Sequence, residues 1–308
     1  MKVLVTGGAG FIGSNLVDRL VSEGHHVVIL DDFSAGNHGF VNPKAEVVEA
    51  DIRDEKKIPD TFLKFKPEAV FHLAAMIELR ESLENPEKSY SINVAGSMNV
   101  INASKQAGVR KFIFASSAAV YGDNQNFPIK ESEPVSPASP YGEQKAGIEQ
   151  ALEESGIPSI ILRYSNVYGP RQGTVGEGGV VAIFCKKLLT GSSLAVFGDG
   201  EQTRDFINVS DIVSANIKAL QSNQQFGVYN ISTGIETSVS ALASALLSVS
   251  QKEAKIEHTE PVRGEVLRNS LDNGLAAREL CWEPEASIQE GLNSTWEWFN
   301  NRHREERA

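Results

Sequence analysis

Short apolar runs alternate with helical patterns through the first half of the chain. Runs rich in Val, Ile, Leu and Phe cover residues 2–7, 26–31, 45–51, 69–75, 111–117 and 158–167. Between several of them, apolar residues recur at helical spacing, as in 14–24, 89–108 and 141–156. Buried strands separated by helices predict a parallel sheet covered on both faces, so we expect an α/β fold with a doubly wound parallel sheet.

The pattern loosens after about residue 168, where Gly and Pro residues predict a loop. Helical spacing returns in 179–191, 211–222, 238–251 and 287–305, and short strands are predicted at 194–200, 227–232 and 255–260. This pattern indicates a smaller α/β lobe packed on the sheet. We assign residues 1–168 to a Rossmann domain and 169–308 mainly to a C-terminal substrate lobe, with some return of the chain to the first domain around 205–232.

A glycine-rich turn, TGGAGFIG, follows the first predicted strand and opens the first predicted helix. Gly7, Gly10 and Gly13 suit a tight turn, a side-chain-free approach for pyrophosphate and close packing of helix on strand. The first helical residues, Phe11 and Ile12, bring N–H groups that can bind phosphate oxygens. The complete arrangement predicts a dinucleotide site, although glycines by themselves are common in such turns.

An acidic pair at the end of the second strand favours NAD over NADP. Asp31 follows Gly13 by 18 residues, and a carboxylate there accepts hydrogen bonds from the ribose hydroxyls and repels a 2′-phosphate. Asp32 strengthens this preference. We also expect Asp51 and Ile52, at the end of the third strand, to flank the adenine, although such a pair is more often only a strand end.

A tyrosine and a lysine stand one helical turn apart in YGEQK, at Tyr141 and Lys145. Because a nearby ammonium favours the phenolate, we expect the pKa of Tyr141 to fall from about 10 towards neutrality, which would make it a general base. The strand at 111–117 ends in Ser117, whose hydroxyl can share the substrate proton at the ligand edge of the sheet. The Tyr–Lys spacing also occurs by chance in helices, and the serine is what gives it weight.

Charge and cysteine content exclude several classes of function. The formal net charge of −11 argues against nucleic-acid binding, which depends on phosphate neutralisation by Lys and Arg. Cys185 and Cys281 fit no disulfide or zinc pattern, so we expect two packed thiols and no metal site. No window approaches the roughly 18 to 20 apolar residues of a membrane span, and the N-terminus runs into glycines. We therefore expect a cytoplasmic protein without a membrane partner.

A series of motifs extends across nearly the whole chain. They are TGGAGFIG, DI at 51–52, HLAA at 72–75, SSAAVYG at 116–122, YGEQK, LRYSNVYGPRQ at 162–172, FGDGEQTRDFINVSD at 197–211 and PVRGE at 261–265. In this order they resemble the extended short-chain dehydrogenases/reductases, and within that family the UDP-glucose 4-epimerases. The resemblance implies that Tyr141 is the base, Lys145 binds the nicotinamide ribose and Ser117 assists at the sugar hydroxyl.

The same resemblance implies a reaction. It is the NAD-dependent 4-epimerisation of a UDP-hexose, interconverting UDP-glucose and UDP-galactose through a transient 4-keto sugar while NAD stays bound. The helices at 89–108 and 141–156 match those that pair in a dimer interface of the family, so we expect a homodimer. The partners expected are therefore a UDP-sugar and a second copy of the chain.

Further site residues follow from the resemblance alone. Leu73, Ala74 and Ala75 would line the cofactor after His72, which is almost as well explained as an ordinary strand-end histidine, and Asn93 would buttress the site from its helix. Arg204 and Arg263 are implied diphosphate ligands, because guanidinium groups match phosphate oxygens, with surface ion pairs as the alternative. Asn166 is implied as a substrate contact, and Val180 as a residue of the sugar pocket.

Several alternative functions share this fold. Dehydratases and decarboxylases of the family carry an acid beside the catalytic serine or threonine, where this chain has Ala118 and Ala119. The sugar can also be an N-acetylhexosamine or a uronate, a choice that we expect to depend on Glu78–Arg80, Val180 and residues 268–275. A non-catalytic NAD-sensing protein and a dehydrogenase with net turnover of NAD(H) complete the alternatives.

Overall fold

The computed structural model describes residues 1–77, 79–174, 179–261 and 266–307. In this part of the chain, the main sheet has seven strands in the order β11-β6-β5-β4-β1-β2-β3, and every neighbouring pair is parallel. The strands are β1 (Lys2–Thr6), β2 (His26–Asp31), β3 (Glu46–Glu49), β4 (Ala69–His72), β5 (Lys111–Ser117), β6 (Ser159–Tyr164) and β11 (Phe226–Ile231). The predicted parallel sheet is confirmed.

Helices cover both faces of this sheet, because alternate residues of each strand point to opposite sides. Val3 and Val5 of β1 join a core with α1 (Phe11–Ser22), α8 (Val209–Gln221) and α10 (Gly274–Leu280). Leu4 joins a second core with α2 (Lys57–Phe65), α5 (Ser97–Ala107) and α6 (Pro140–Ser155). The sheet is therefore doubly wound, as predicted.

The helix expected at 89–108 is interrupted. The chain forms α3 (Leu79–Glu84), α4 (Pro86–Tyr90), a π-helical turn η2 (Ser91–Gly96) and then α5. Turns of this wider kind often occur at functional sites. Here the turn contains Asn93, whose side chain bonds the backbone of Met76 after β4, so the interruption connects this helix to the ligand edge of the sheet.

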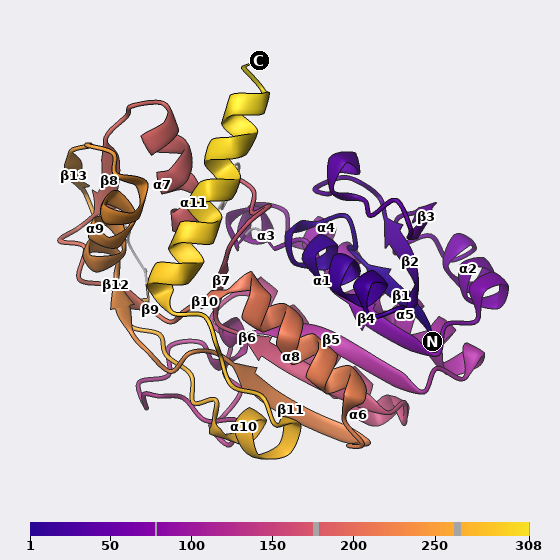
Figure 1. Cartoon of the computed structure of the whole chain (residues 1–308). Helices are drawn as coiled ribbons and strands as arrows, with labels where there is room; N and C mark the ends of the chain where they lie inside the picture. Colours follow the sequence, from indigo (N-terminus) through magenta and orange to yellow (C-terminus); the bar gives the residue numbers. More distant parts are fainter. Residues whose placement is uncertain (78, 175–178, 262–265, 308) are drawn as a thin grey trace.

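A second group of elements packs at one end of the molecule, at the left of Figure 1. Its helices α7 (Val180–Leu189), α9 (Val239–Ser250) and α11 (Ile288–Glu305) share a core of their own. Its strands form three pairs: β7 (Asn166–Tyr168) with β10 (Phe206–Asn208), β8 (Leu194–Phe197) with β13 (Ile256–Thr259), and β9 (Thr203–Arg204) with β12 (Thr237–Ser238). Between these elements the chain returns to the main sheet as α8 and β11. The domain boundaries given above stay a prediction.

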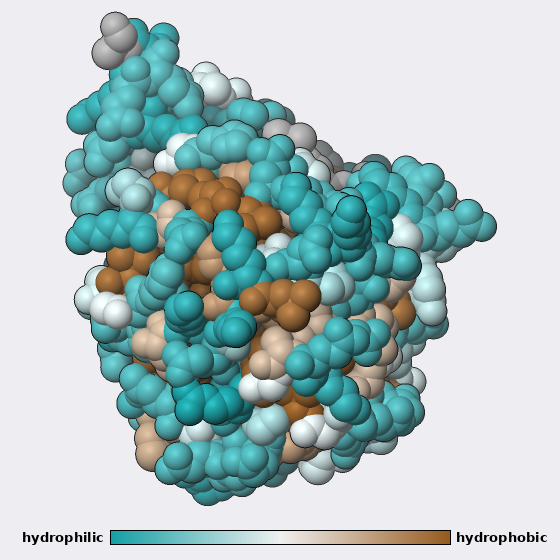
Figure 2. All heavy atoms as spheres, turned by 90° about the vertical axis from the view of Figure 1, so that its right-hand side faces the viewer, coloured by the Kyte–Doolittle hydropathy of each residue, from teal (hydrophilic) through white to brown (hydrophobic). Residues whose placement is uncertain are grey.

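The β3 end of the sheet has a largely hydrophilic surface, with apolar residues in separate groups (Figure 2). Glu46 and Glu49 are exposed at the two ends of β3, and charges on an edge strand disfavour pairing with a strand of another molecule. Two short 3₁₀ helices, η1 (His38–Phe40) and η3 (Ala118–Tyr121), complete the described elements. None of the helices in the described ranges is long and apolar enough to cross a bilayer.

Candidate active site

The carboxyl ends of five sheet strands meet at one edge of the sheet. Ligands of doubly wound folds bind outside this edge, because the turns that follow the strands gather there. The residues that end these strands are Thr6, Asp31, His72, Ser117 and Tyr164. The glycine turn, the acidic pair, the Leu73–Ala75 segment and the candidate serine therefore lie along a single edge.

The glycine turn is tightly packed at Gly7 and Gly13 and open at Gly10. Gly7 has φ +68°, and a Cβ on it would lie 2.8 Å from the amide nitrogen of Ala74, so a larger residue cannot stand there. A Cβ on Gly13 would lie 2.0 Å from the carbonyl oxygen of Gly7. A Cβ on Gly10, the N-cap of α1, would meet among the described atoms only that same oxygen, at 3.2 Å. The helix N-terminus is thus open to a ligand.

The first turn of α1 suits an anion. N–H groups at this position, which include those of Phe11 and Ile12, have no partner within a helix, and the helix dipole adds partial positive charge. No acidic side chain lies in this turn. The open space at Gly10 and these donors together fit the pyrophosphate of a dinucleotide.

The acidic pair after β2 splits into a buried and an exposed carboxylate. Asp31 is buried and accepts hydrogen bonds from the amides of Ala9 and Phe33, both at 2.9 Å. Burial raises the pKa of Asp31, and these two hydrogen bonds oppose the rise. Asp32 is exposed and accepts from the amide and hydroxyl of Ser34. Asp31 is therefore held beside the glycine turn, where a ribose hydroxyl would reach it.

The expected adenine pair has other partners in the structure. Asp51 forms an ion pair with Arg53, whose Nη2 lies 2.5 Å from Oδ2 of the carboxylate. Ile52 is 5% exposed and packs in the second core, against Gly96 of the π-helical turn. The structure thus places Ile52 mainly in the core, and its contact with adenine stays a prediction.

A chain of buried hydrogen bonds holds the segment after β4. The hydroxyl of Ser97 donates to the carbonyl oxygen of Asn93, so it accepts from Nε2 of His72 at 2.8 Å. Nδ1 of His72 in turn accepts from the hydroxyl of Thr6 at 2.7 Å, and Thr6 accepts from the amide of Ala74. His72 is therefore neutral with its proton on Nε2, and burial lowers its pKa to about 3. It is a structural strand-end histidine that helps to fix Leu73 and Ala74 beside Gly7.

The candidate catalytic residues come together at the start of α6. Ser139 caps this helix by accepting from the amide of Gly142, and Pro140 is its first residue. One turn later the Nζ atom of Lys145 lies 5.7 Å from the centre of the Tyr141 ring and donates to the carbonyl oxygen of Ala115 at 2.7 Å. Ser117, two residues further along β5, forms a hydrogen bond with Tyr141 that favours the phenolate.

The electrostatics of the tyrosine differ from the sequence-based expectation. Burial raises the pKa of Tyr141 to about 12, and the hydrogen bond with Ser117 only partly opposes this. Burial also lowers the pKa of Lys145 to about 8. The expected lowering of the tyrosine pKa by Lys145 is wrong for the protein by itself, because the loss of hydration of the phenolate dominates.

A buried ion pair behind these residues was not anticipated from the sequence. Glu149, one turn beyond Lys145, binds Arg163 of β6 and the hydroxyl of Ser116. Two signals were present: Glu149 continues the spacing of Tyr141 and Lys145, and Arg163 is a charge inside an otherwise apolar strand. A charge in a buried strand predicts a buried partner.

The expected substrate residues fall outside the main sheet. The amide of Asn166, at the start of β7, donates to the carbonyl oxygen of Asp205, which brings Asn166 beside Arg204. Arg204 is partly buried and its Nη1 donates to the carbonyl oxygen of Thr203. Val180 begins α7 and packs against the core of the second group of elements. Arg263 and Glu78 lie outside the described residues.

The two cysteines have different environments. Cys185 of α7 is buried, as expected. Cys281 is exposed, so the expectation of a packed thiol is wrong there. It is the C-cap of α10 with φ +52°, a chain-reversal position that the apolar pattern around it does not reveal.

Comparisons with known proteins relate this chain to nucleotide-sugar epimerases. Residues 3–232 match the NAD dependent epimerase/dehydratase family. A UDP-glucose 4-epimerase of Mycolicibacterium smegmatis is 41% identical over 98% of this chain and 99% of its own. The crystal structure of a Thermotoga maritima UDP-glucose 4-epimerase with UDP-glucose has a TM-score of 0.95 at 40% identity, covering 98% of this chain and 99% of that one. A UDP-N-acetylglucosamine 4-epimerase of Methanobrevibacter ruminantium has a TM-score of 0.93 at 33% identity, covering 98% of both chains.

Proposed function

Because the chain belongs to the NAD-dependent epimerase/dehydratase family of extended short-chain dehydrogenases/reductases, we propose that it catalyses the 4-epimerisation of a UDP-hexose, with UDP-glucose and UDP-galactose as substrates. It is an enzyme of the epimerase type that its relatives represent. The observation that carries the choice of reaction is the meeting of Tyr141, Lys145 and Ser117 at the sheet edge that bears the glycine turn.

The chain's own residues handle the proton. Tyr141, as a phenolate, accepts the proton of the sugar's 4-hydroxyl, and Ser117 bonds the same oxygen. NAD, when bound, supplies the acceptor and then the donor of the C4 hydride. Tyr141 returns the proton when the hydride comes back to the opposite face of the 4-keto sugar. Atoms and electrons balance without net redox, so the reaction consumes no cofactor.

The cofactor residues are proposed from the fit described above. The turn of Gly7, Gly10 and Gly13 with the amides of Phe11 and Ile12 would hold the pyrophosphate. Asp31 would accept from the adenosine ribose, with Asp32 beside it as a second negative charge. Lys145 would bind the nicotinamide ribose, and Leu73–Ala75 would line the ring side of the site.

The substrate contacts are proposed from the positions of the residues. Asn166 is on β7, which pairs with β10, and Arg204 ends β9 two residues before β10 begins, where its guanidinium can bind a diphosphate. Val180 begins α7, whose core includes Tyr168 of β7 and Phe206 of β10, and Arg263 enters only through the family motif. Ala118 and Ala119 follow Ser117 without a carboxylate, which favours epimerisation over elimination.

The proposed function is tested by incubating the purified protein with UDP-galactose and no added NAD. Formation of UDP-glucose supports the proposal, since retained cofactor suffices for a reaction without net redox. A need for stoichiometric NAD and a net rise in absorbance at 340 nm would instead favour a dehydrogenase. Bound NAD without turnover of any UDP-sugar would favour a sensing protein.

An N-acetylated sugar is a second candidate substrate. The similarity to the M. ruminantium enzyme, at 33% identity over nearly the whole chain, is the observation that favours it. Ratios of kcat/KM for UDP-galactose, UDP-N-acetylgalactosamine and UDP-galacturonate separate the alternatives. The proposal expects UDP-galactose to have the highest value.

We also propose a homodimer that pairs α5 and α6 of each copy. These helices pack side by side on one face of the sheet, and the neighbouring Tyr90 is 58% exposed. Light scattering coupled to size exclusion at micromolar concentration should give twice the chain mass. A monomeric mass would contradict the proposal.

A further inference from the structure

Glu149 lies on the same face of α6 as the proposed catalytic pair, one turn beyond Lys145. Its side chain is 8% exposed and that of Arg163 is 5% exposed. Nη2 of Arg163 lies 2.5 Å from Oε2 of Glu149, and Nε contacts both carboxylate oxygens. The hydroxyl of Ser116 donates to Oε1 at 2.5 Å. Every oxygen of this buried carboxylate is therefore occupied by a protein donor.

The same ion pair extends to the turn after the candidate serine. Nη1 of Arg163 donates to the hydroxyl of Tyr121 at 2.8 Å, and Tyr121 donates to Oδ1 of Asn230 at 2.7 Å. Tyr121 ends η3, which begins directly after Ser117. The network thus joins α6, β6, η3 and β11 around the end of β5.

Two successive residues of β5 are fastened to two successive turns of α6. Lys145 binds the carbonyl oxygen of Ala115, and Glu149 binds the hydroxyl of Ser116. These contacts fix where α6 lies along β5. They therefore fix the separation between Ser117, the next residue of the strand, and Tyr141, one turn before Lys145 on the helix.

We propose that Glu149, held by Arg163, is a positioning residue of the reaction: it fixes Ser117 against Tyr141 and keeps a negative charge one turn from the ammonium of Lys145. This inference rests on the proposed roles of those three residues. Glu149 itself touches no reacting atom. Its contribution is expected in kcat more than in KM, because it sets geometry at the reacting hydroxyl and not the binding of the nucleotide.

Among the described groups around Lys145, Glu149 is the one that stabilises its ammonium by charge. From β5, Lys145 meets the carbonyl oxygen of Ala115 and the ring of Phe114, and its own helix presents Tyr141. His72 is the titratable group on β4 whose pKa the charge of Lys145 helps to lower, and it is neutral. Burial lowers the pKa of Lys145 to about 8, and Glu149 is the group that opposes this shift. Removal of the carboxylate should therefore lower that pKa further.

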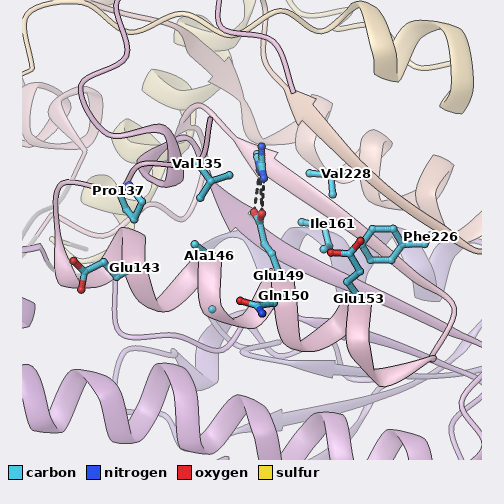
Figure 3. Close-up of a pocket in the computed structure, with 12 residues that line it drawn as sticks. Val135, Pro137, Glu143, Ala146, Glu149, Gln150, Glu153, Ile161, Phe226 and Val228 are labelled. Carbon is cyan, nitrogen blue, oxygen red and sulfur yellow. Dashed lines mark hydrogen bonds and ion pairs between the residues drawn. The ribbon is translucent and has the colours of Figure 1, made fainter. Parts of the chain in front are cut away.

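A cavity gives access to the ion pair from the side of α6 that faces β11 (Figure 3). Its volume is about 520 Å³, and Glu149 and Arg163 are among the residues that line it. In the figure, Glu149 points from α6 towards its dashed bonds, with Ile161 and Val228 beside it. A small carboxylate can therefore reach the guanidinium if the glutamate side chain is shortened.

The first experiment compares E149Q with D211N in the protein as isolated with its cofactor. Asp211 is also a buried carboxylate, but it accepts from the amides of Glu285 and Ala286 on the α8 side of the sheet. E149Q should lower kcat by about 10- to 100-fold, as small displacements of reacting groups do, with KM changed less than about threefold. The alkaline limb of the pH profile of kcat should move to lower pH. D211N should keep the parental kcat and profile.

The second experiment is chemical rescue. In E149A, added formate or acetate should restore kcat with saturation, because the anion can bind Arg163 and Ser116 through the cavity, and chloride at equal ionic strength should not. If E149A does not fold, the double variant E149Q/R163M is used, because it removes both charges of the pair. It should fold and should show the same loss of kcat as E149Q. A parental kcat in a folded E149Q, or a double variant that regains full kcat, would overturn the proposal.

A third measurement needs no activity. The titration of Lys145 is followed by NMR in lysine-labelled protein, its signal assigned by its loss in K145M. Its midpoint should fall in E149Q and stay unchanged in D211N; an unchanged midpoint in E149Q would overturn the role of the charge. Failure of the proposed function would look different: the parental protein would form no UDP-glucose from UDP-galactose, whatever the titration of Lys145 showed.

Discussion

The ammonium of Lys145 lies 5.7 Å from the centre of the Tyr141 ring, and its hydrogen bond goes to the carbonyl oxygen of Ala115. The two side chains are neighbours without being hydrogen-bonded to each other. The pKa of Tyr141 is accordingly set by burial, which raises it to about 12. A phenol in this state is protonated at neutral pH, so the proposed role of Tyr141 as a base needs further stabilisation of the phenolate. We expect the positive charge of bound NAD⁺ to supply it.

Binding of NAD⁺ should lower the pKa of Tyr141. In cofactor-free protein, the absorbance change of phenolate at 295 nm that is lost in Y141F should have its midpoint near 12. The midpoint should shift to lower pH with NAD⁺ and much less with NADH, whose nicotinamide ring is neutral. Equal midpoints with and without NAD⁺ would show that the cofactor does not activate the tyrosine.

Replacement of Tyr141 by Phe should abolish most turnover and leave the fold intact. Loss of the general base is expected to lower kcat by about 10² to 10⁴-fold. The assay is conversion of UDP-galactose to UDP-glucose, with the amount of released NAD measured as the control for cofactor binding. A variant with parental NAD content and parental kcat would remove Tyr141 from the mechanism.

Two glycine-to-alanine changes should have opposite effects. In G13A the new Cβ would lie 2.0 Å from the carbonyl oxygen of Gly7, so the turn must open and NAD binding should be lost. In G147A, on the exposed side of α6, the Cβ meets no described atom within 4 Å. Alanine should raise the free energy of unfolding there by about 0.5 to 1 kcal/mol. Urea unfolding and NAD content test both changes.

The buried neutral His72 should make the protein sensitive to acid. Its pKa is about 3 in the folded chain against 6.5 in an unfolded one, so the unfolded state binds the extra proton between these values. Stability from this group is complete above pH 6.5 and is lost as pH falls, by up to about 1.4 kcal/mol per unit. The free energy of unfolding, measured with urea at pH 7, 6 and 5, should fall less steeply with decreasing pH in H72Q than in the parental protein. An equal dependence on pH in both proteins would contradict a neutral His72.

The thiols should react at different rates. Cys281 is exposed and should react quickly with DTNB in the native protein. Cys185 is buried, and burial raises its pKa to about 12, so it should react only after unfolding. The fast phase should disappear in C281S. A fast phase that persists would mean that Cys185 is accessible.

Local pattern predicted the sheet strands well where each strand is an apolar run between polar residues. The predicted strands at 26–31 and 111–117 coincide with β2 and β5. The predicted strand at 158–167 divides into β6 and β7, because Ser165 still bonds Ile231 of the sheet while Asn166 bonds Asp205. That partner lies about forty positions away, so no local pattern could reveal the division.

The sequence predicted which residues form the candidate site, but not the pKa of its tyrosine. The spacing of Tyr141 and Lys145 placed both on one face of a helix, which the structure confirms. The direction of the tyrosine pKa was wrong, because spacing says nothing about how far the phenol is removed from water. The sequence did not reveal the structural role of Asp205, whose buried carboxylate accepts hydrogen bonds from the amides of Thr233, Gly234 and Leu271. Its donors come from segments that only the folded chain brings together.

The last strand of the main sheet to be synthesised, β11, follows β7, α7, β8, β9 and β10 of the second group of elements. During synthesis, a chain that has emerged through β6 lacks the neighbour that pairs with it on that side. Ribosome-bound chains that end before Phe226 should therefore expose β6 as a bare edge and depend on holding factors. Protease resistance of the nascent sheet should begin once Ile231 has left the exit tunnel.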